Sequence, residues 1–298
     1  MTYKSGFVAI VGRPNVGKST LLNKILGQKI VITSDKPQTT RRRIKGIYTT
    51  EKGQIIFVDT PGIHKPIFKL GEFLLEEAKL AIPDADVILF LVDGTEKAGP
   101  GDKWIIENLL NTDKSVIMAV NKVDQVKSLE KRDEIIASYK ELFKEKTLPI
   151  IKISAKTGRN VDDLIKNIYR KLSKGPQYYP EDEVTDQNIR SIVEEMIREQ
   201  ILENTREEVP HSVAVILDSY ETKETIVNIA ASIIVETDSQ KGILIGNQGS
   251  MLKKVGTDAR KEIETLVENK VYLQLFVKVK KDWRKKDFNL KEFGYHND

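Results

Sequence analysis

Short apolar runs alternate with segments of helical periodicity along the first 173 residues. The runs at 7–11, 54–58, 86–92, 115–120 and 148–153 are almost continuously apolar, as in strands that are buried on both faces of a parallel sheet. The helices expected between them are 20–26, which ends at Gly27, 68–80, 102–110, 129–143 and 161–172. This alternation predicts an α/β domain over 1–173, with a mixed, mostly parallel sheet and helices on both faces.

One pair of strands departs from the alternation. Residues 45–50 and 54–58 flank Glu51-Lys52-Gly53, which is a hairpin signal, so we expect one antiparallel strand. Before this hairpin, residues 34–43 are polar and charged and contain Pro37, which predicts a mobile loop.

The pattern changes after residue 173. Residues 174–180 contain two prolines and a glycine, and we interpret 174–187 as a linker. The elements expected beyond it are a helix at 188–205, strands at 212–219 and 225–237, an apolar segment and glycine loop at 243–256, a helical stretch at 252–269, and a strand at 271–279. This order predicts a smaller α+β domain over 188–298 that ends in a basic C-terminal tail.

Composition and charge narrow the class of protein. Hydrophobic residues make up 40% and charged residues 31%, so we expect a soluble globular chain without a signal peptide or membrane span. The chain has no cysteine, which excludes disulfides and thiolate metal sites and favours the cytoplasm. Residues 181–240 carry 4 basic and 15 acidic side chains, whereas 241–286 carry 12 and 5. The basic charge therefore gathers where a nucleic-acid-binding face could use it.

Gly12 to Ser19 fits the P-loop pattern of Gly, four residues and Gly-Lys-Ser, between an expected strand and an expected helix. The glycines let the backbone curl so that its N–H groups point at phosphate oxygens, with the positive end of the helix dipole behind them. We expect Lys18 to reach the β- and γ-phosphates. The predicted phosphate-binding residues are Gly12, Arg13, Pro14, Asn15, Val16, Gly17, Lys18, Ser19 and Thr20.

Two motifs at the ends of later strands favour guanine over adenine. In Asn121-Lys122-Val123-Asp124, the carboxylate of Asp124 can accept both the N1–H and the exocyclic amine of guanine, whereas adenine would leave it unpaired. We expect Asn121 to tie this segment to the P-loop and the stem of Lys122 to lie on the base. Ser154, Ala155 and Lys156 are expected to support the guanine O6 and the ring face.

A magnesium site is predicted from three oxygen ligands, Ser19, Thr40 and Asp59. Asp59 would hold the ion through water, and the N–H of Gly62 would meet the γ-phosphate. A threonine of the 34–43 loop would bind Mg²⁺ only while the γ-phosphate is present, which would make the loop a switch. We favour Thr40 over Thr39 for this role.

The five motifs in this order resemble the translation-factor class of small GTPases. The forms Gly-Arg-Pro-Asn-Val-Gly-Lys-Ser, Gln-Thr-Thr-Arg and Asp-Thr-Pro-Gly resemble the bacterial Era family, and the resemblance covers nearly the whole chain. It implies a GTPase that converts GTP to GDP and phosphate. It also implies a C-terminal type II K-homology (KH) domain that binds the 3′ end of 16S ribosomal RNA and assists assembly and maturation of the 30S ribosomal subunit.

The residue after Gly62 departs from the Ras pattern. Ile63 stands where Ras-like enzymes place a water-orienting glutamine, so we expect slow intrinsic hydrolysis that relies on positioning and charge. Similar GTPases use K⁺ held by the P-loop asparagine, which is Asn15 here. His64 is a candidate base, but we interpret it as a loop histidine without a function. The predicted catalytic residues are Asn15, Lys18, Thr40 and Gly62.

The segment from Gly246 to Gly249 forms a Gly-x-x-Gly loop, with apolar residues before it and a basic helix after it. It resembles the KH loop that clamps a short single strand of RNA. In such a loop the glycines have no side chains, so the RNA phosphates can approach the backbone, and nearby lysines neutralise their charge. Ile243 and Ile245 would receive bases, and Trp283 within the basic run 280–286 would stack on RNA. The alternatives are a plain glycine turn and a solvated basic tail. The predicted RNA-binding residues are Ile245, Gly246, Asn247, Gln248, Gly249, Ser250, Lys253, Lys254, Lys280, Lys281, Trp283 and Arg284.

These interpretations combine into a GTP-hydrolysing, RNA-binding switch that uses GTP/GDP, Mg²⁺ and K⁺. GTP would order residues 33–43 and 59–70 and so alter the contact between the domains. For Arg41, Arg42 and Arg43 two interpretations are open: they contact RNA or partner phosphates, or they form a solvated run of charges. One alternative is a GTPase that acts through a protein or membrane partner, with the second domain a protein-binding module. Another is an RNA-binding protein whose nucleotide is only structural. We expect a cytoplasmic monomer; family members are partly peripheral at the inner face of the membrane, and nothing in this sequence would anchor one there.

Overall fold

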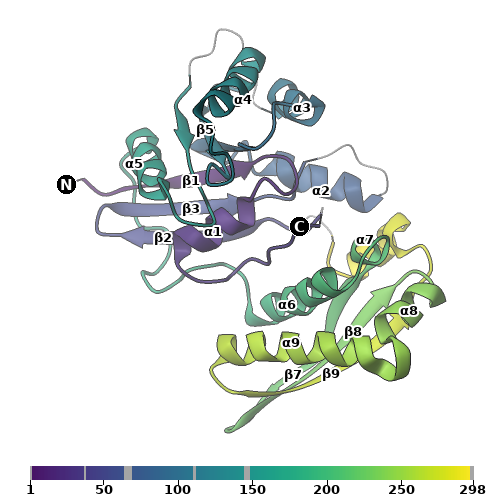
Figure 1. The fold of residues 1–298 in the computed structure, drawn as a ribbon. Coiled ribbons are helices and arrows are strands. Elements are labelled where there is room, and N and C mark those ends of the chain that lie inside the picture. Colours follow the sequence, from purple (N-terminus) through teal and green to yellow (C-terminus); the bar gives the residue numbers. More distant parts are fainter. Residues whose placement is uncertain (1, 37, 64–68, 110–111, 144–147, 296–298) are drawn as a thin grey trace. The chain divides into compact units, whose positions relative to one another are not determined.

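The computed structural model describes residues 2–36, 38–63, 69–109, 112–143 and 148–295 (Figure 1). The chain forms two compact units, and each is described by itself. The first comprises Met1–Val31, Thr40–Lys65 and Leu74–Asp186, and the second comprises Ile32–Thr39, Pro66–Phe73 and Gln187–Asp298. The second unit therefore includes two short segments from the N-terminal half of the sequence.

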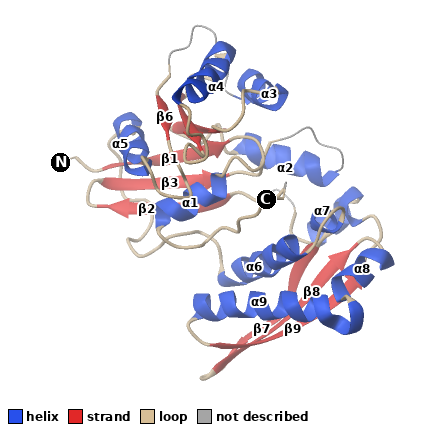
Figure 2. Ribbon diagram, in the orientation of Figure 1, coloured by secondary structure: helices blue, strands red, loops and turns tan. Residues whose placement is uncertain are grey.

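The first unit is built on a six-stranded sheet in the order β2-β3-β1-β4-β5-β6 (Figure 2). Its strands are β1 (Lys4–Val11), β2 (Ile44–Thr50), β3 (Gly53–Asp59), β4 (Val87–Asp93), β5 (Ser115–Asn121) and β6 (Ile150–Lys152). Only β2 runs antiparallel to its neighbour, and the other pairs are parallel. The predicted fold class of this domain, including its one antiparallel strand, is confirmed.

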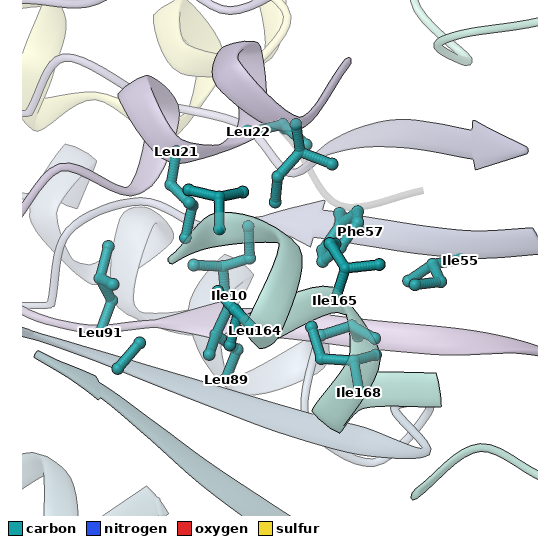
Figure 3. Close-up of a cluster of buried hydrophobic side chains, with 14 of the residues drawn as sticks. Ile10, Leu21, Leu22, Ile55, Phe57, Leu89, Leu91, Leu164, Ile165 and Ile168 are labelled. Atoms are coloured by element: carbon teal, nitrogen blue, oxygen red, sulfur yellow. The ribbon is translucent and has the colours of Figure 1, made fainter. Parts of the chain in front are cut away.

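Helices cover both faces of this sheet. The helices are α1 (Lys18–Leu26), α2 (Lys69–Leu80), α3 (Pro100–Leu109), α4 (Leu129–Leu142) and α5 (Val161–Lys171). On one face, Leu21 and Leu22 of α1 and Leu164 of α5 pack against Ile10 and Phe57 of the strands (Figure 3). On the other face, α2, α3 and α4 bury a second apolar cluster. Because alternate residues of β1, β3, β4 and β5 enter opposite cores, these strands are largely apolar, which is why the sequence pattern could find them.

The segment interpreted as a linker lies along the first unit. The side chain of Gln54, which is fully buried, accepts from the backbone N–H of Tyr178 at 2.8 Å and of Tyr179 at 3.0 Å. Thr185 forms an antiparallel bridge with Gly46 on β2. Contacts with residues that are distant in sequence, such as Gln54 and Gly46, hold this segment. Its own composition, rich in Pro and Tyr, therefore indicated only a break in regular structure.

The second unit packs helices on one face of a three-stranded sheet, β7-β8-β9, in which β7 and β8 are antiparallel and β8 and β9 are parallel. Its longer elements are α6 (Ile189–Asn204), β7 (Ala214–Thr222), β8 (Ile226–Val235), α8 (Asp238–Ile245), α9 (Ser250–Val267) and β9 (Lys270–Val279). Its short elements are α7 (Val209–Ser212), η1 (Asn247–Gly249), η2 (Trp283–Lys285) and α10 (Asp287–Glu292). Helices α6 and α9 lie over this sheet (Figure 1). Apolar side chains of α6, α8 and α9 form one core with the sheet. The order helix-strand-strand-helix-helix-strand matches the predicted type II KH arrangement.

The C-terminal segment is folded, contrary to the predicted basic tail. Trp283 is fully buried and packs against Phe293 and Tyr295, with ring centroids 5.4 and 5.9 Å apart. Its Nε1–H donates to the carbonyl oxygen of Ser212 at 2.8 Å. Within the described part of the chain, none of the helices is long and apolar enough to cross a membrane.

Candidate functional site

The P-loop connects the end of β1 to the start of α1, as the sequence pattern predicts. Gly12 and Gly17 are required by close approaches: an added Cβ at Gly12 would lie 2.3 Å from the carbonyl oxygen of Leu91, and one at Gly17 would lie 2.4 Å from Nδ2 of Asn121. Gly17 also has φ of 99°, in the left-handed region that favours glycine. The loop is therefore tightly fitted to β4 and to the end of β5.

Lys18 is buried beneath this loop. Its Nζ donates to the carbonyl oxygens of Gly12 at 3.1 Å and Arg13 at 2.9 Å. Desolvation lowers the pKa of Lys18 to about 8, although the Asp59 carboxylate acts in the opposite direction. The ammonium group is thus held where anionic phosphates would relieve the cost of its burial.

Lys18 gives nucleotide binding a testable pH dependence. Bound phosphates should raise its pKa above the value of about 8 in the free protein, so above pH 8 binding must take up a proton. We expect GDP affinity to be nearly constant from pH 7 to 8 and then to fall, approaching about tenfold per pH unit. Isothermal titration in buffers of different ionisation enthalpy measures this proton, and equal affinity at pH 7 and pH 9 without proton uptake would contradict the assignment.

Three oxygen-bearing side chains converge beside Lys18. Ser19 Oγ lies 2.9 Å from Thr40 Oγ1 and donates to Asp59 Oδ2 at 2.8 Å, and Thr40 Oγ1 donates to the same carboxylate oxygen at 3.3 Å. Burial raises the pKa of Asp59, opposed by the nearby Lys18 charge. Asp59 Oδ1 is buried without a hydrogen-bond partner among the described residues. A hard divalent cation suits this set of hydroxyl and carboxylate oxygens.

The geometry favours Thr40 over Thr39 in this cluster. Thr40 is 5% exposed and faces Asp59, whereas the hydroxyl of Thr39 donates to the carbonyl oxygen of Lys36 at 2.6 Å. Gly62 lies against the P-loop, because an added Cβ there would come within 2.7 Å of Pro14 Cα. Ile63 is buried, and His64 lies outside the described residues. Asn15, the predicted potassium ligand, is an exposed P-loop residue with φ of 63°.

The side chain of Asn121 joins three of the predicted motifs. Its Nδ2 donates to the carbonyl oxygen of Val16 at 2.8 Å, and its Oδ1 accepts from the backbone N–H of Ala155 at 2.8 Å. The predicted tie between this segment and the P-loop is therefore present. Ser154 and Ala155 are buried, whereas Asp124 and Lys156 are exposed at the sheet edge.

Two side chains of the nucleotide site have partners that the sequence pattern did not indicate. Lys122 pairs with Asp93 at the end of β4. Burial of Asp93 acts to raise its pKa, but hydrogen bonds from Lys122 and Thr95 outweigh burial and lower the pKa. Arg13 was predicted to bind nucleotide, but its side chain pairs with Glu96 and with the buried Asp102. Only the backbone of Arg13 remains for phosphate, because its guanidinium anchors the loop to α3. No local sequence signal links Arg13 with residues more than 80 positions away.

A groove of about 520 Å³ lies in the second unit between α9 and β9, beginning at the Gly-x-x-Gly loop. Gly246 and Gly249 have φ of 71° and 79°; nothing lies within 4 Å of an added Cβ at Gly249. The predicted residues Asn247, Gln248, Ser250, Lys253, Lys254 and Lys281 are exposed, and Ile245 and Gly246 are partly buried. Gly249 of the open loop and the exposed Lys253 thus line the same groove.

The groove extends beyond the residues that the Gly-x-x-Gly pattern indicated. Gly256, Thr257 and Arg260 line it from α9, and Tyr272 and Leu275 line it from β9. The α9 residues follow Gly249 and Lys253 at helical spacing, so extending the helical face along the sequence would have found them. The strand residues have no such local signal.

Four predictions about RNA contacts or solvated charges need correction. The predicted stacking of Trp283 on RNA is wrong, because the indole is buried in the C-terminal core. Arg284 is also unsuited to RNA contact: its guanidinium pairs with Glu236, and its side chain is 12% exposed. Lys280 pairs with Glu292 at the surface. Finally, Arg41 is only 2% exposed and Arg43 pairs with Glu77, so residues 41–43 do not form a solvated run.

The P-loop site on a mostly parallel sheet and the following Gly-x-x-Gly domain define a two-domain GTPase with a KH domain. The family described as 50S ribosome-binding GTPase matches residues 7–122, and the KH domain family matches 208–284. GTPase Era of Rippkaea orientalis and GTPase Era of Crocosphaera subtropica are each 53% identical over 293 residues, which is 98% of this chain and 93% of each relative. This chain belongs to the Era family of GTPases, as its motifs indicated, and hydrolyses GTP to GDP and phosphate.

Two solved structures are similar over nearly the full length. A variant of Aquifex aeolicus Era bound to GDP and AlF4⁻ is 41% identical with a TM-score of 0.94, over 99% of this chain and 100% of that chain. Era in complex with MgGDPNP and nucleotides 1506–1542 of 16S ribosomal RNA is 41% identical with a TM-score of 0.95 over the same shares. The similarity therefore includes both units.

Proposed function

We propose that this GTPase binds the 3′ end of 16S ribosomal RNA through the groove beside Gly246–Gly249 and assists assembly of the 30S subunit. The observation that carries the proposal is the open Gly-x-x-Gly loop at the mouth of the groove between α9 and β9. Lys253 and Arg260 supply cationic groups along it, and Leu252 and Leu275 supply apolar surface for bases. A similar Era structure contains a 16S ribosomal RNA fragment.

Guanine nucleotide and Mg²⁺ are the proposed ligands of the first unit. Ser19, Thr40 and Asp59 would hold Mg²⁺, which supplies positive charge that stabilises the transferring phosphoryl group. Lys18 and the P-loop backbone would bind and orient the phosphates. With Ile63 buried and unable to orient water, hydrolysis would be slow and would depend on charge and position.

We also propose K⁺ at the exposed Asn15 as an accelerator of hydrolysis. Its extra positive charge would compensate for the missing glutamine. Equal GTPase rates in KCl and NaCl, unchanged by Asn15→Ala, would rule this out.

The loop that carries Thr40 is proposed to act as the switch. Residues 32–39 belong to the second unit, where Glu199 accepts from the backbone N–H of Thr33 at 2.8 Å and the buried Arg198 donates to the carbonyl oxygen of Thr39. The next residue, Thr40, bonds to Asp59. A change of ligands at Thr40 would therefore strain a loop that also bonds to Arg198 and Glu199 of the RNA-binding unit.

A pair of substitutions at Gly249 tests RNA binding. Its positive φ and the open space around it accept asparagine better than most residues, so Gly249→Asn is a neutral, isosteric control for Gly249→Asp. We expect Gly249→Asp to weaken binding of 16S nucleotides 1506–1542 by at least about tenfold, because its carboxylate repels phosphate, and Gly249→Asn to weaken it by less than about threefold.

Wild-type levels of binding in both variants would contradict the proposed RNA site. If the wild-type protein itself fails to bind RNA, or binds it without salt dependence, the alternative of a GTPase acting through a protein or membrane partner is favoured instead.

A reducing cytoplasm is the proposed compartment, since the chain carries no cysteine.

A further inference from the structure

The segment that selects the base is braced by a side chain from outside the predicted motifs. Arg132 lies in the first turn of α4, and its guanidinium reaches back over the preceding loop, as helical side chains do. Nη2 donates to the carbonyl oxygen of Val123 at 3.1 Å, and Nε donates to the carbonyl oxygen of Val126. One rigid, planar group thus bridges two carbonyls on either side of Asp124.

Among the described residues, the other hydrogen bonds hold the start of this segment, and Val126 at its far end is buried. The backbone N–H of Val123 donates to the carbonyl oxygen of Ile153 at 3.2 Å, and Asn121 is fixed by its own two hydrogen bonds. Gln125 forms a turn bond to Lys122 at 3.0 Å, which closes the turn but does not attach it to a neighbouring element. Asp124 itself is exposed. Arg132 therefore supplies the hydrogen bonds that tie the far side of the turn to the body of α4.

The N-terminus of α4 gives Arg132 a firm base. Ser128 caps the helix by accepting from the backbone N–H of Lys131 at 3.2 Å, and its carbonyl oxygen accepts from the N–H of Arg132 at 3.3 Å. Ile135 and Ile136, in the next turn, are buried in the core. The guanidinium therefore projects from a fixed helix end and not from a free loop.

We propose that Arg132 is a positioning residue for base selection. By holding the carbonyls of Val123 and Val126, it keeps the Asp124 carboxylate aligned with both adjacent donors of guanine. To accept from both donors at once, the Asp124 carboxylate must keep its plane as well as its distance fixed relative to the base. A looser turn should therefore weaken the hydrogen bond from the exocyclic amine most. Lysine cannot replace arginine here, because a single ammonium group lacks the planar fork. The inference rests on the proposed role of Asp124 in binding guanine and is independent of the proposed RNA binding.

The test compares GDP with inosine diphosphate, whose base keeps N1–H but lacks the exocyclic amine. The ratio of the two affinities measures the second hydrogen bond of Asp124. We expect Arg132→Gln and Arg132→Lys each to lower this ratio by about tenfold, mainly through weaker GDP binding. Lys131→Gln removes a charge from the adjacent exposed residue and should leave the ratio unchanged.

A double-substitution cycle separates positioning from general stability. In an Asp124→Ala background the ratio should already be low, and Arg132→Lys should not lower it further. An unchanged ratio in the single variants, or equal losses of affinity for both nucleotides, would overturn the proposal. If Arg132→Gln fails to fold, Arg132→Lys, which keeps the charge and most of the side chain, decides the question.

Discussion

Replacement of Asp124 by asparagine will shift the base preference of this GTPase from guanine to xanthine. The asparagine amide offers one acceptor and one donor, so it faces the guanine amine with a second donor and leaves one hydrogen bond unmade. Xanthine carries a carbonyl at that position and matches the amide. Sites built to hydrogen-bond a ligand reject a mismatched one strongly, and we expect GDP affinity to fall by on the order of a thousandfold or more.

Competition binding of GDP and xanthosine diphosphate measures this shift. Asp162→Asn, at an exposed position of α5, is a matched control that should leave both affinities unchanged. If Asp124→Asn keeps the wild-type preference for GDP, then Asp124 does not select the base, and the role proposed for Arg132 fails with it.

The second large effect is expected at Asp59. Asp59→Asn removes the charge from the predicted magnesium site while keeping its shape, and we expect GTP hydrolysis at saturating nucleotide and Mg²⁺ to fall by roughly a hundredfold to a thousandfold. The folded protein should not lose stability. Burial raises the pKa of Asp59 above its value in the unfolded chain. At a pH above the folded-state pKa, keeping this carboxylate ionised therefore lowers the free energy of unfolding. Asparagine has the same shape without the charge, so it relieves this cost.

Single-turnover hydrolysis and thermal unfolding of the nucleotide-free variant measure the two effects separately. A loss of activity together with a large fall in the unfolding temperature would indicate that Asp59 is mainly structural. Wild-type hydrolysis by the variant would remove Asp59 from the magnesium site.

The sequence predicted most of the first unit because its signals are local. Strands β1, β3, β4 and β5 enter both cores and are largely apolar, and four of the five motifs follow the end of a parallel strand. The elements deviate from their expected bounds by a few residues at most, as in β6, where only Ile150–Lys152 pair with β5. The tie made by Asn121 was also predictable, because parallel strands bring their carboxyl ends to one edge of the sheet.

The errors concern side chains whose partners are distant in sequence. Trp283 lies in a basic run, and only its packing against Phe293 and Tyr295 shows that the run covers a small core. Arg284 pairs with Glu236, 48 residues away, so it resembled a free cation in the sequence. Arg13 was likewise assigned to nucleotide, because its acceptors Asp102 and Glu96 are distant in sequence. Arg132 was unassigned although its acceptors lie only 6 and 9 residues away, because it belongs to none of the motifs. Basic residues near a motif are therefore weak indicators of ligand contact until their partners are known.

The central claim is that one chain selects a guanine nucleotide and conveys its state to an RNA groove. The most direct measurement is the equilibrium affinity of the purified full chain for 16S nucleotides 1506–1542, with GDP and with a non-hydrolysable GTP analogue, at two salt concentrations. The account predicts binding that weakens with salt and is at least about tenfold tighter with the GTP analogue. Equal affinity in the two nucleotide states, or no binding in either, would contradict it.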